Sequence, residues 1–305
     1  MYDMIIVGAG PAGLSAAIYA KRAALDALVI EKNPLCGGQV MNTYEVDNYL
    51  GLPGIGGFEM AERFRGHADG LNCEFVEAEV TEIMKNDESE PFFTVKTDQG
   101  EFESSTILIA TGASHAKLGI PGEMEFAGMG VSYCATCDGA FFRGRTVAVV
   151  GGGDVAVEDA IFLARGCEKV YLIHRRDELR AAAILKESLK KLTNVEIIWN
   201  SVVEKINGEE QVENISVKNI NNNEINTINV AGVFIAVGLV PNSVVFKDVV
   251  PLNEKGYVIA DENGITEMQG IFAAGDVRTK KLRQIITAVA DGAVAVTSIQ
   301  QYLLG

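Results

Sequence analysis

Cys134 and Cys137, two cysteines separated by two residues, have the best spacing for chemistry in this chain of 305 residues. An apolar run at 146–150 follows them and opens into the glycine turn 151–153, a type that binds the pyrophosphate of a dinucleotide. A second such turn occupies residues 8–13. Two dinucleotide sites and one dithiol describe a path for two electrons, from a nicotinamide through a flavin to a disulfide.

The first turn has the spacing GxGxxG, formed by Gly8, Gly10, Pro11, Ala12 and Gly13. The first glycine allows the tight turn, the second lets the backbone approach a pyrophosphate, and the third lets the next helix close on the strand. The pyrophosphate would meet the free N–H groups at that helix N-terminus. The following apolar run ends on Glu31, which could accept a hydrogen bond from a ribose 2′-hydroxyl. We therefore predict a bound dinucleotide rather than a packing turn alone.

The second turn is followed by cations where the first is followed by an acid. The turn and the start of its helix supply Gly151, Gly153, Asp154 and Ala156. After it, the strand-like run 169–173 leads into His174, Arg175, Arg176 and Arg180. The planar fork of arginine suits an extra phosphate on the ribose, so the pattern favours NADPH. A solvated basic patch is the alternative, which a chain of net charge −15 makes less attractive.

Composition and charge restrict the class of protein. Hydrophobic residues make up 48% of the chain and charged residues 22%, as in ordinary soluble proteins. A pI near 4.7 argues against nucleic acid or an anionic membrane as partner. The chain has no basic-then-apolar leader and no apolar run of about 18 residues, so we expect a cytoplasmic protein without a membrane span.

A close cysteine pair in a reducing compartment is more often catalytic or metal-binding than structural. A zinc site usually takes a second CxxC or paired histidines. The histidines, His67, His115 and His174, show no such spacing, so we predict a redox dithiol and no metal. The scattered cysteines, Cys36, Cys73 and Cys167, are expected to pack as small apolar side chains.

An internal repeat sets the predicted architecture. Residues 5–10 are echoed by 149–153, and 107–112 by 233–238, so each half runs from a glycine turn to an apolar strand that ends in glycine. Antiparallel strand patterns lie between these landmarks, at 92–97 with 101–102 and at 197–203 with 212–218. The predicted fold class is α/β, with two Rossmann-like three-layer βα domains and β-meander crossovers.

One of the two domains is predicted to be discontinuous. After Pro241 the chain adds a strand-like run at 270–276 and an amphipathic helix from about Gln284 to Tyr302. These elements are surplus to the second half and would complete the first. We therefore expect one domain at 1–113 plus 245–305 and an inserted domain at 114–244 that carries the dithiol. The linker candidates, 113–122 and 238–242, contain proline or glycine.

These features cover nearly the whole chain and resemble low-molecular-weight bacterial thioredoxin reductase, a class II pyridine nucleotide-disulfide oxidoreductase. The resemblance implies FAD in the discontinuous domain, NADPH in the inserted domain, a homodimer, and thioredoxin as partner. It also implies further cofactor-binding residues, namely Gly38, Gln39, Asn48, Val80, Thr111, Gly112, Gly275, Asp276, Arg283, Gln284 and Ile285. The chain departs from the usual family residues at Ala140, Val155 and Leu282.

The resemblance also implies a reaction sequence. Hydride passes from NADPH to FAD, reduced FAD opens a Cys134–Cys137 disulfide, and the dithiol exchanges with oxidised thioredoxin. Cys137 is implied to be the sulfur next to the flavin. Asp138 is the candidate general acid, because thiolate and flavin chemistry need a proton source. Since Asp-Gly is a common turn dipeptide, Asp138 could instead serve the turn alone.

Three alternatives remain open on sequence grounds. The first is a reductase that feeds a peroxidase or another dithiol carrier, a class that often has an additional N-terminal dithiol domain. A ferredoxin-fed relative would have little use for the second dinucleotide turn and its arginines. A flavin redox sensor, from a different functional class, would need no second dinucleotide site.

Overall fold

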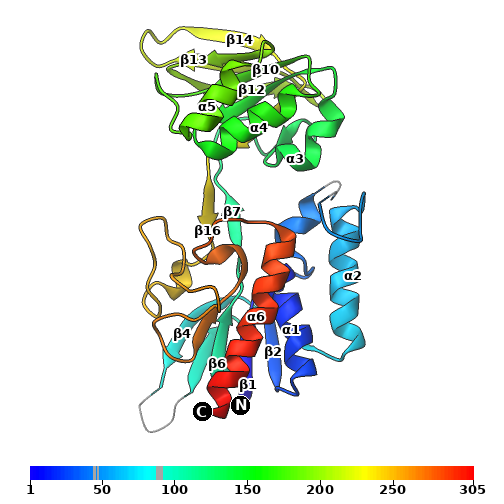
Figure 1. The fold of residues 1–305 in the computed structure, drawn as a ribbon, viewed down its shortest axis with the longest axis vertical. Helices are drawn as coiled ribbons and strands as arrows, with labels where there is room; N and C mark the ends of the chain where they lie inside the picture. The colour runs from blue at the N-terminus through cyan, green and yellow to red at the C-terminus, as the bar shows by residue number, and fades with distance from the viewer. Residues whose placement is uncertain (44–45, 47, 87–91) are drawn as a thin grey trace. The chain divides into compact units, whose positions relative to one another are not determined.

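The computed structural model describes the whole chain except residues 44, 45, 47 and 87–91. The chain forms two compact units, unit 1 at Met1–Ser114 with Val240–Gly305, and unit 2 at His115–Leu239. Each unit is built on a sheet of largely parallel strands with helices packed on it (Figure 1). The predicted α/β fold class is confirmed.

Unit 1 contains a seven-stranded sheet in the order β3-β2-β1-β6-β5-β4, with β17 also paired to β6. Its strands are β1 (Tyr2–Val7), β2 (Ala27–Glu31), β3 (Glu74–Glu77), β4 (Val80–Lys85), β5 (Phe93–Thr97), β6 (Gly100–Ile109) and β17 (Ile271–Ala273). Strands β3, β2, β1, β6 and β17 pair in parallel. Strands β4, β5 and β6 form an antiparallel meander, as the sequence pattern predicted for the second and third of them.

The helices of unit 1 are α1 (Pro11–Arg22), α2 (Gly57–Gly70) and α6 (Ile285–Leu304), with short 3-10 turns η1 (Gly38–Asn42), η3 (Val244–Phe246) and η4 (Gly275–Val277). Along β1, Met4 and Ile6 face the core shared with α1 and α6, while Ile5 and Val7 face the opposite core. This alternation follows from the two-residue period of a strand, and apolar residues on both faces are typical of a covered sheet. The predicted C-terminal helix forms as α6, which packs beside α1 (Figure 1).

The packing of α6 on α1 depends on Gly292. A Cβ atom at Gly292 would overlap the carbonyl oxygen of Ala12 in α1. Alanine normally favours a helix over glycine by about 0.5–1 kcal/mol, but overpacking typically costs about 1–3 kcal/mol. We therefore expect Gly292→Ala to lower the free energy of unfolding, measured by urea denaturation. The matched control Gly66→Ala, at an exposed position of α2 with open space around it, should raise the free energy of unfolding instead. Equal stabilisation by both changes would contradict this packing.

Unit 2 has a parallel sheet in the order β11-β10-β9-β15-β8 and a separate antiparallel sheet in the order β12-β13-β14. The parallel strands are β8 (Val131–Ser132), β9 (Thr146–Gly151), β10 (Lys169–Ile173), β11 (Val195–Ile198) and β15 (Gly232–Ala236). The antiparallel strands are β12 (Ser201–Gly208), β13 (Val212–Asn219) and β14 (Ile225–Asn229). The helices are α3 (Ala135–Asp138), α4 (Asp154–Ala164) and α5 (Ala183–Lys190), with the 3-10 turn η2 (Gly139–Phe142) after α3.

The two faces of the parallel sheet in unit 2 meet different partners. Val147 and Val149 of β9 pack in the core formed with α4 and α5, whereas Ala148 and Val150 pack toward the antiparallel sheet. Unit 2 is therefore layered as helices, parallel sheet and antiparallel sheet. This arrangement places the N-terminus of α4 at the carboxyl end of β9, where the second glycine turn lies.

One predicted strand, 197–203, is wrong as a single element. Its first part ends the parallel sheet as β11 at Ile198, and its second part begins the antiparallel sheet as β12 at Ser201. Asn200 lies between them with φ +50°, the left-handed region that asparagine tolerates better than most residues. The apolar pattern runs through this turn, so periodicity alone did not reveal it.

The two connections between the units pair with each other. They form a two-stranded sheet of β7 (Ala113–His115) and β16 (Leu239–Pro241). No helix in the described part of the chain is both long and apolar enough to cross a membrane.

Candidate redox and dinucleotide sites

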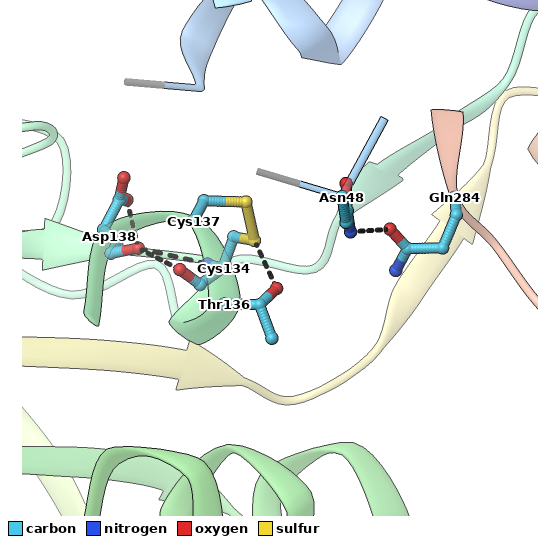
Figure 2. The surroundings of a disulfide bond; sticks show 7 residues. Asn48, Cys134, Thr136, Cys137, Asp138 and Gln284 are labelled. Carbon is cyan, nitrogen blue, oxygen red and sulfur yellow. Dashed lines mark hydrogen bonds between the residues drawn. A yellow bond between two sulfur atoms is a disulfide. The ribbon is translucent and has the colours of Figure 1, made fainter. Parts of the chain in front are cut away.

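Cys134 and Cys137 form a disulfide with their Cα atoms 5.3 Å apart (Figure 2). Cys134 is the N-cap of the single-turn helix α3, so the CxxC spacing brings both sulfurs to one side of the turn. Both residues are half-buried, and an exchange partner could therefore reach them. The remaining cysteines are free, with Cys36 and Cys167 buried and Cys73 half-buried.

Cys36 packs in an apolar core of unit 1, as expected, but its sulfur also contacts a cation. Nη1 of Arg65 lies 3.0 Å from the sulfur of Cys36 and donates a hydrogen bond to it. Burial nevertheless raises the pKa of the Cys36 thiol, because desolvation outweighs the nearby guanidinium. The thiol is therefore poorly reactive at neutral pH.

Asp138 follows Cys137 at the end of α3 and is held by Ser132. The hydroxyl of Ser132 donates to Oδ2 of Asp138 at 2.6 Å and accepts the backbone N–H of Cys134 at 3.1 Å. Burial raises the pKa of the Asp138 carboxyl, and the bond from Ser132 lowers it by less. A carboxyl that keeps its proton to higher pH is suited to act as a general acid. Sequence reasoning missed Ser132, whose only signal was its position just before the CxxC.

The first glycine turn is open at the N-terminus of α1. Gly8 has φ +106°, and a Cβ atom at Gly13 would overlap the carbonyl oxygen of Gly8, so α1 packs directly on the turn. A Cβ atom at Gly10 would meet no atom within 4 Å, and α1 has no side-chain cap at this end. Pro11 and Ala12 begin the helix. Free N–H groups beside open space are what a bound pyrophosphate requires.

Glu31 contacts the turn itself. Its Oε2 accepts the backbone N–H of Ala9 at 2.7 Å, and its Oε1 accepts both nitrogens of Asn33, at 3.0 and 2.8 Å. A carboxylate has about four acceptor positions, so these bonds leave capacity for a ribose hydroxyl. Glu31 therefore supports the turn in addition to its predicted ligand role.

Asp276 gives the clearest indication of a ligand-binding position in unit 1. It lies in η4, after β17, and its buried Oδ1 has no hydrogen-bond partner in the described part of the chain. Most buried polar atoms are hydrogen-bonded, so this oxygen fits a ligand that carries hydroxyl groups. Desolvation raises the pKa of the Asp276 carboxyl. The neighbouring Gly275 donates its N–H to Asp291 at 2.9 Å.

Arg283 mainly shapes the loop between η4 and α6. Its guanidinium donates to the carbonyl oxygens of Asp276, Arg278 and Lys280 and lies over the ring of Tyr257. The predicted contact of Arg283 with a cofactor would therefore compete with these hydrogen bonds of its guanidinium.

The other residues predicted on the flavin side lie in several parts of unit 1. Gln284 caps α6 just before Ile285 and accepts a hydrogen bond from Nδ2 of Asn48 at 2.9 Å (Figure 2). A Cβ atom on Gly38 would lie 3.5 Å from Cα of Gly10, so η1 approaches the first turn, and Gln39 beside it is exposed.

Thr111, Gly112 and Val80 complete the predicted flavin-side set. Thr111 and Gly112 are tied to Asn242, with the Thr111 hydroxyl 2.6 Å from the Asn242 carbonyl oxygen. Val80 is buried in the core at the start of β4, which leaves only its backbone for a ligand. These ligand contacts remain predictions.

The second turn is fastened to the loop that follows β10. The ring of His174 is buried against Gly152, and its Nε2 lies 3.0 Å from the Glu178 carbonyl oxygen. Oδ1 of Asp154 accepts the N–H of Ala182 at 2.8 Å, and the N–H of Arg180 donates to Gly152. His174 and Asp154 therefore position the loop, and a ligand contact of the His174 ring remains a prediction. As at Gly10, a Cβ atom at Gly153 would meet open space, while Ala156 is buried under Gly151.

Arg175, Arg176 and Arg180 are exposed on this fastened loop. Within the described residues, none of the three guanidinium groups has a hydrogen-bond or carboxylate partner. By contrast, buried Arg278 forms two bonds to Asp291, each of 2.9 Å. Three unpartnered cations beside the second glycine turn, in a chain of net charge −15, have the chemistry to bind a phosphate group, and this contact remains a prediction.

The fold and the site define a two-unit α/β oxidoreductase with a redox-active disulfide. Residues 2–292 match the family described as Pyridine nucleotide-disulphide oxidoreductase, and the chain belongs to this family. Thioredoxin reductase of Bacillus subtilis (strain 168) is 42% identical, over 99% of this chain and 95% of its own length. Thioredoxin reductase of Listeria monocytogenes serovar 1/2a (strain ATCC BAA-679 / EGD-e) is 45% identical, over 99% and 94%. The resemblance seen in the sequence is thus confirmed.

Solved structures agree with these relatives. The crystal structure of thioredoxin reductase from Streptococcus pyogenes MGAS5005 has a TM-score of 0.88 at 42% identity, covering 100% of this chain and 98% of that one. Thioredoxin reductase from Giardia duodenalis has a TM-score of 0.87 at 32% identity, covering 100% and 99%.

Proposed function

We propose that this protein is an NADPH-dependent, FAD-containing thioredoxin-disulfide reductase. The observation that carries the proposal is the Cys134–Cys137 disulfide, which lies beside a carboxyl of raised pKa, Asp138, and just before a dinucleotide turn. The names of the relatives support thioredoxin as the partner.

In this proposal, the discontinuous domain, 1–113 with 245–305, holds FAD. The turn at 8–13 receives the pyrophosphate, and Glu31 accepts a hydrogen bond from a ribose hydroxyl. The unpartnered oxygen of Asp276 accepts a hydrogen bond from a hydroxyl of the flavin side chain.

The inserted domain, 114–244, holds NADPH, with Arg175, Arg176 and Arg180 around the 2′-phosphate. When bound, FAD would take a hydride from NADPH and supply two electrons for disulfide reduction. By the family resemblance, the protein works as a cytoplasmic homodimer.

The chain's own residues carry out the exchange with thioredoxin. Opening the disulfide with two electrons and one proton leaves one thiol and one thiolate, and Asp138 is placed to hold that proton. The thiolate then attacks the thioredoxin disulfide, and a mixed disulfide forms as one thioredoxin thiolate leaves. The second cysteine, once deprotonated, displaces the other thioredoxin sulfur. The original disulfide is restored and thioredoxin carries both electrons away as a dithiol.

A single assay tests this function against its alternatives. NADPH should bleach the flavin absorbance of the purified protein, and oxidised thioredoxin should restore it over many cycles. Bleaching without reoxidation by thioredoxin, but with reoxidation by another dithiol carrier, would support a peroxidase-feeding reductase. Bleaching without turnover on any carrier would support a redox sensor, and reduction by ferredoxin alone a ferredoxin-fed enzyme.

Replacing Asp138 by asparagine tests whether Asp138 is the general acid. Asp138→Asn keeps an acceptor for Ser132 but removes the proton, and general acid catalysis contributes about 10²–10⁴-fold. We expect thioredoxin turnover to fall at least about 10²-fold. The acid works in its protonated form, so the wild-type rate should fall as pH rises through the pKa of Asp138. This alkaline limb of the pH profile, the fall in rate at high pH, should be absent in Asp138→Asn.

The control for this variant is Asp159→Asn. Burial and the neighbouring Glu158 raise the pKa of Asp159 to about 7, but Asp159 lies on α4 rather than on the dithiol helix. The Asp159 variant should retain the alkaline limb. Loss of the limb in Asp159→Asn, with retention in Asp138→Asn, would reassign the acid to Asp159.

A further inference from the structure

A buried carboxylate, Glu123, joins residues 118–119 at the start of unit 2 to Tyr133, the residue before the CxxC. Glu123 is 1% exposed and forms no ion pair within the described residues. Its Oε1 accepts the N–H of Leu118 at 3.0 Å and the hydroxyl of Tyr133 at 2.8 Å, while its Oε2 accepts the N–H of Gly119 at 2.7 Å. Burying a charge without such bonds is costly, so these contacts hold one another in place.

Tyr133 contacts the connecting segment, residues 115–119, directly at His115 and indirectly through Glu123. Besides its hydroxyl bond to Glu123, its ring stacks on the ring of His115, with centroids 5.3 Å apart and planes at 28°. His115 is the last residue of β7, one of the two strands that connect the units. Burial lowers the pKa of His115, so this ring is neutral at pH 7 and the stack adds no charge beside Glu123.

On the other side, the same short loop contacts the redox residues. Tyr133 directly precedes Cys134, and Ser132 directly precedes Tyr133. The hydroxyl of Ser132 bonds to Asp138 and to the N–H of Cys134, around the disulfide seen in Figure 2. Successive side chains of an extended segment point in opposite directions. Residues 132–134 therefore link the disulfide on one side to the connecting segment on the other.

We propose that Tyr133 is a positioning residue that couples the redox state of the Cys134–Cys137 pair to the connecting segment. Reduction breaks the S–S bond, and two electrons with one proton leave a thiol and a thiolate that are no longer held together. Any backbone adjustment at Cys134 passes through one peptide bond to Tyr133, and through its hydroxyl to Glu123 and the N–H groups of Leu118 and Gly119. This inference rests on the proposed redox cycle of the dithiol.

Coupling of this kind is reciprocal. If reduction changes the state of the connecting segment, that state changes the reduction equilibrium of the disulfide by the same factor, typically about 5–150-fold. Replacing a residue that only stabilises the fold would lower the stability of both redox states alike. It would leave the equilibrium between disulfide and dithiol unchanged.

Hydrogen exchange on the FAD-loaded, full-length protein tests the coupling. Amide exchange at Leu118 and Gly119 is compared before and after reduction by dithiothreitol, whose own dithiol is oxidised to a cyclic disulfide. In the wild type we expect exchange at these amides to differ about fivefold or more between the two states. In Tyr133→Phe, which keeps the ring on His115 but lacks the hydroxyl, this redox dependence should be lost. The equilibrium constant with dithiothreitol should shift by about the same factor.

The matched control removes the same kind of bond elsewhere. Tyr2 donates its hydroxyl to Glu74 at 2.9 Å in unit 1, and Tyr2→Phe should leave the redox dependence at 118–119 unchanged. Equal exchange in both redox states of the wild type would overturn the coupling, as would an unaltered response in Tyr133→Phe. Thiol titration distinguishes a failure of the coupling from a failure of the proposed redox cycle. Reduction should raise the number of thiols per chain from the three free cysteines to all five. A pair that dithiothreitol fails to reduce would overturn the proposed redox cycle and the coupling together.

Discussion

Changing Cys134 or Cys137 to serine is expected to lower thioredoxin turnover on the order of 10³-fold or more, because a hydroxyl cannot replace a thiolate in disulfide exchange. Reduction of bound FAD by NADPH should continue at nearly the wild-type rate, since only the last transfer needs both sulfurs. Anaerobic stopped-flow absorbance of the flavin measures the first half-reaction. A coupled thioredoxin assay measures the whole cycle.

The matched control for these variants is Cys73→Ser. Cys73 is half-buried like the pair, but it is free and lies in unit 1. Its replacement should leave both half-reactions near wild type. Thioredoxin turnover at the wild-type rate by either dithiol variant would remove the pair from the mechanism. The ratio of FAD to protein must match wild type for the comparison to count.

Replacing both Arg175 and Arg176 by alanine is expected to raise the KM for NADPH about 100-fold or more. A hydrogen bond to a charged group contributes about 1.5–3 kcal/mol, which corresponds to roughly 10–150-fold in binding for each bond lost. Both guanidinium groups are exposed and unpartnered in the described structure, so their loss leaves no buried group unsatisfied. The KM for NADH, which lacks the 2′-phosphate, should change little. Steady-state kinetics with the two cofactors measures the difference.

Arg165→Ala is the control for the arginine variant. Arg165 is also exposed in unit 2, but it is the C-cap of α4, at the opposite end of the helix from the glycine turn. Its loss should leave both KM values unchanged. Equal weakening of NADPH and NADH by the double variant would show that Arg175 and Arg176 support the fold rather than select the cofactor.

Much of the fold followed from local sequence patterns. The apolar runs at β1 and β9, each ending in a glycine turn, identify parallel strands that lead into helices. The C-terminal helix α6 was expected within a few residues of its observed bounds. Such features depend on glycine geometry and on the periods of strands and helices, which act over a few residues. The same locality explains the failure at 197–203, where one turn at Asn200 sends a continuous apolar pattern into two sheets.

The sequence by itself determined the chemical types present: a CxxC pair, an adjacent carboxyl, two dinucleotide turns, and arginines after the second. Only the tertiary structure decided which side chains hold these groups in place. Ser132 meets Asp138, His174 packs under Gly152, and Tyr133 reaches Glu123. The physical reason is that such contacts depend on side-chain direction and on the path of the backbone between residues. Spacing along the chain specifies neither, because a buried polar group takes whichever partner the packed fold brings within hydrogen-bond distance.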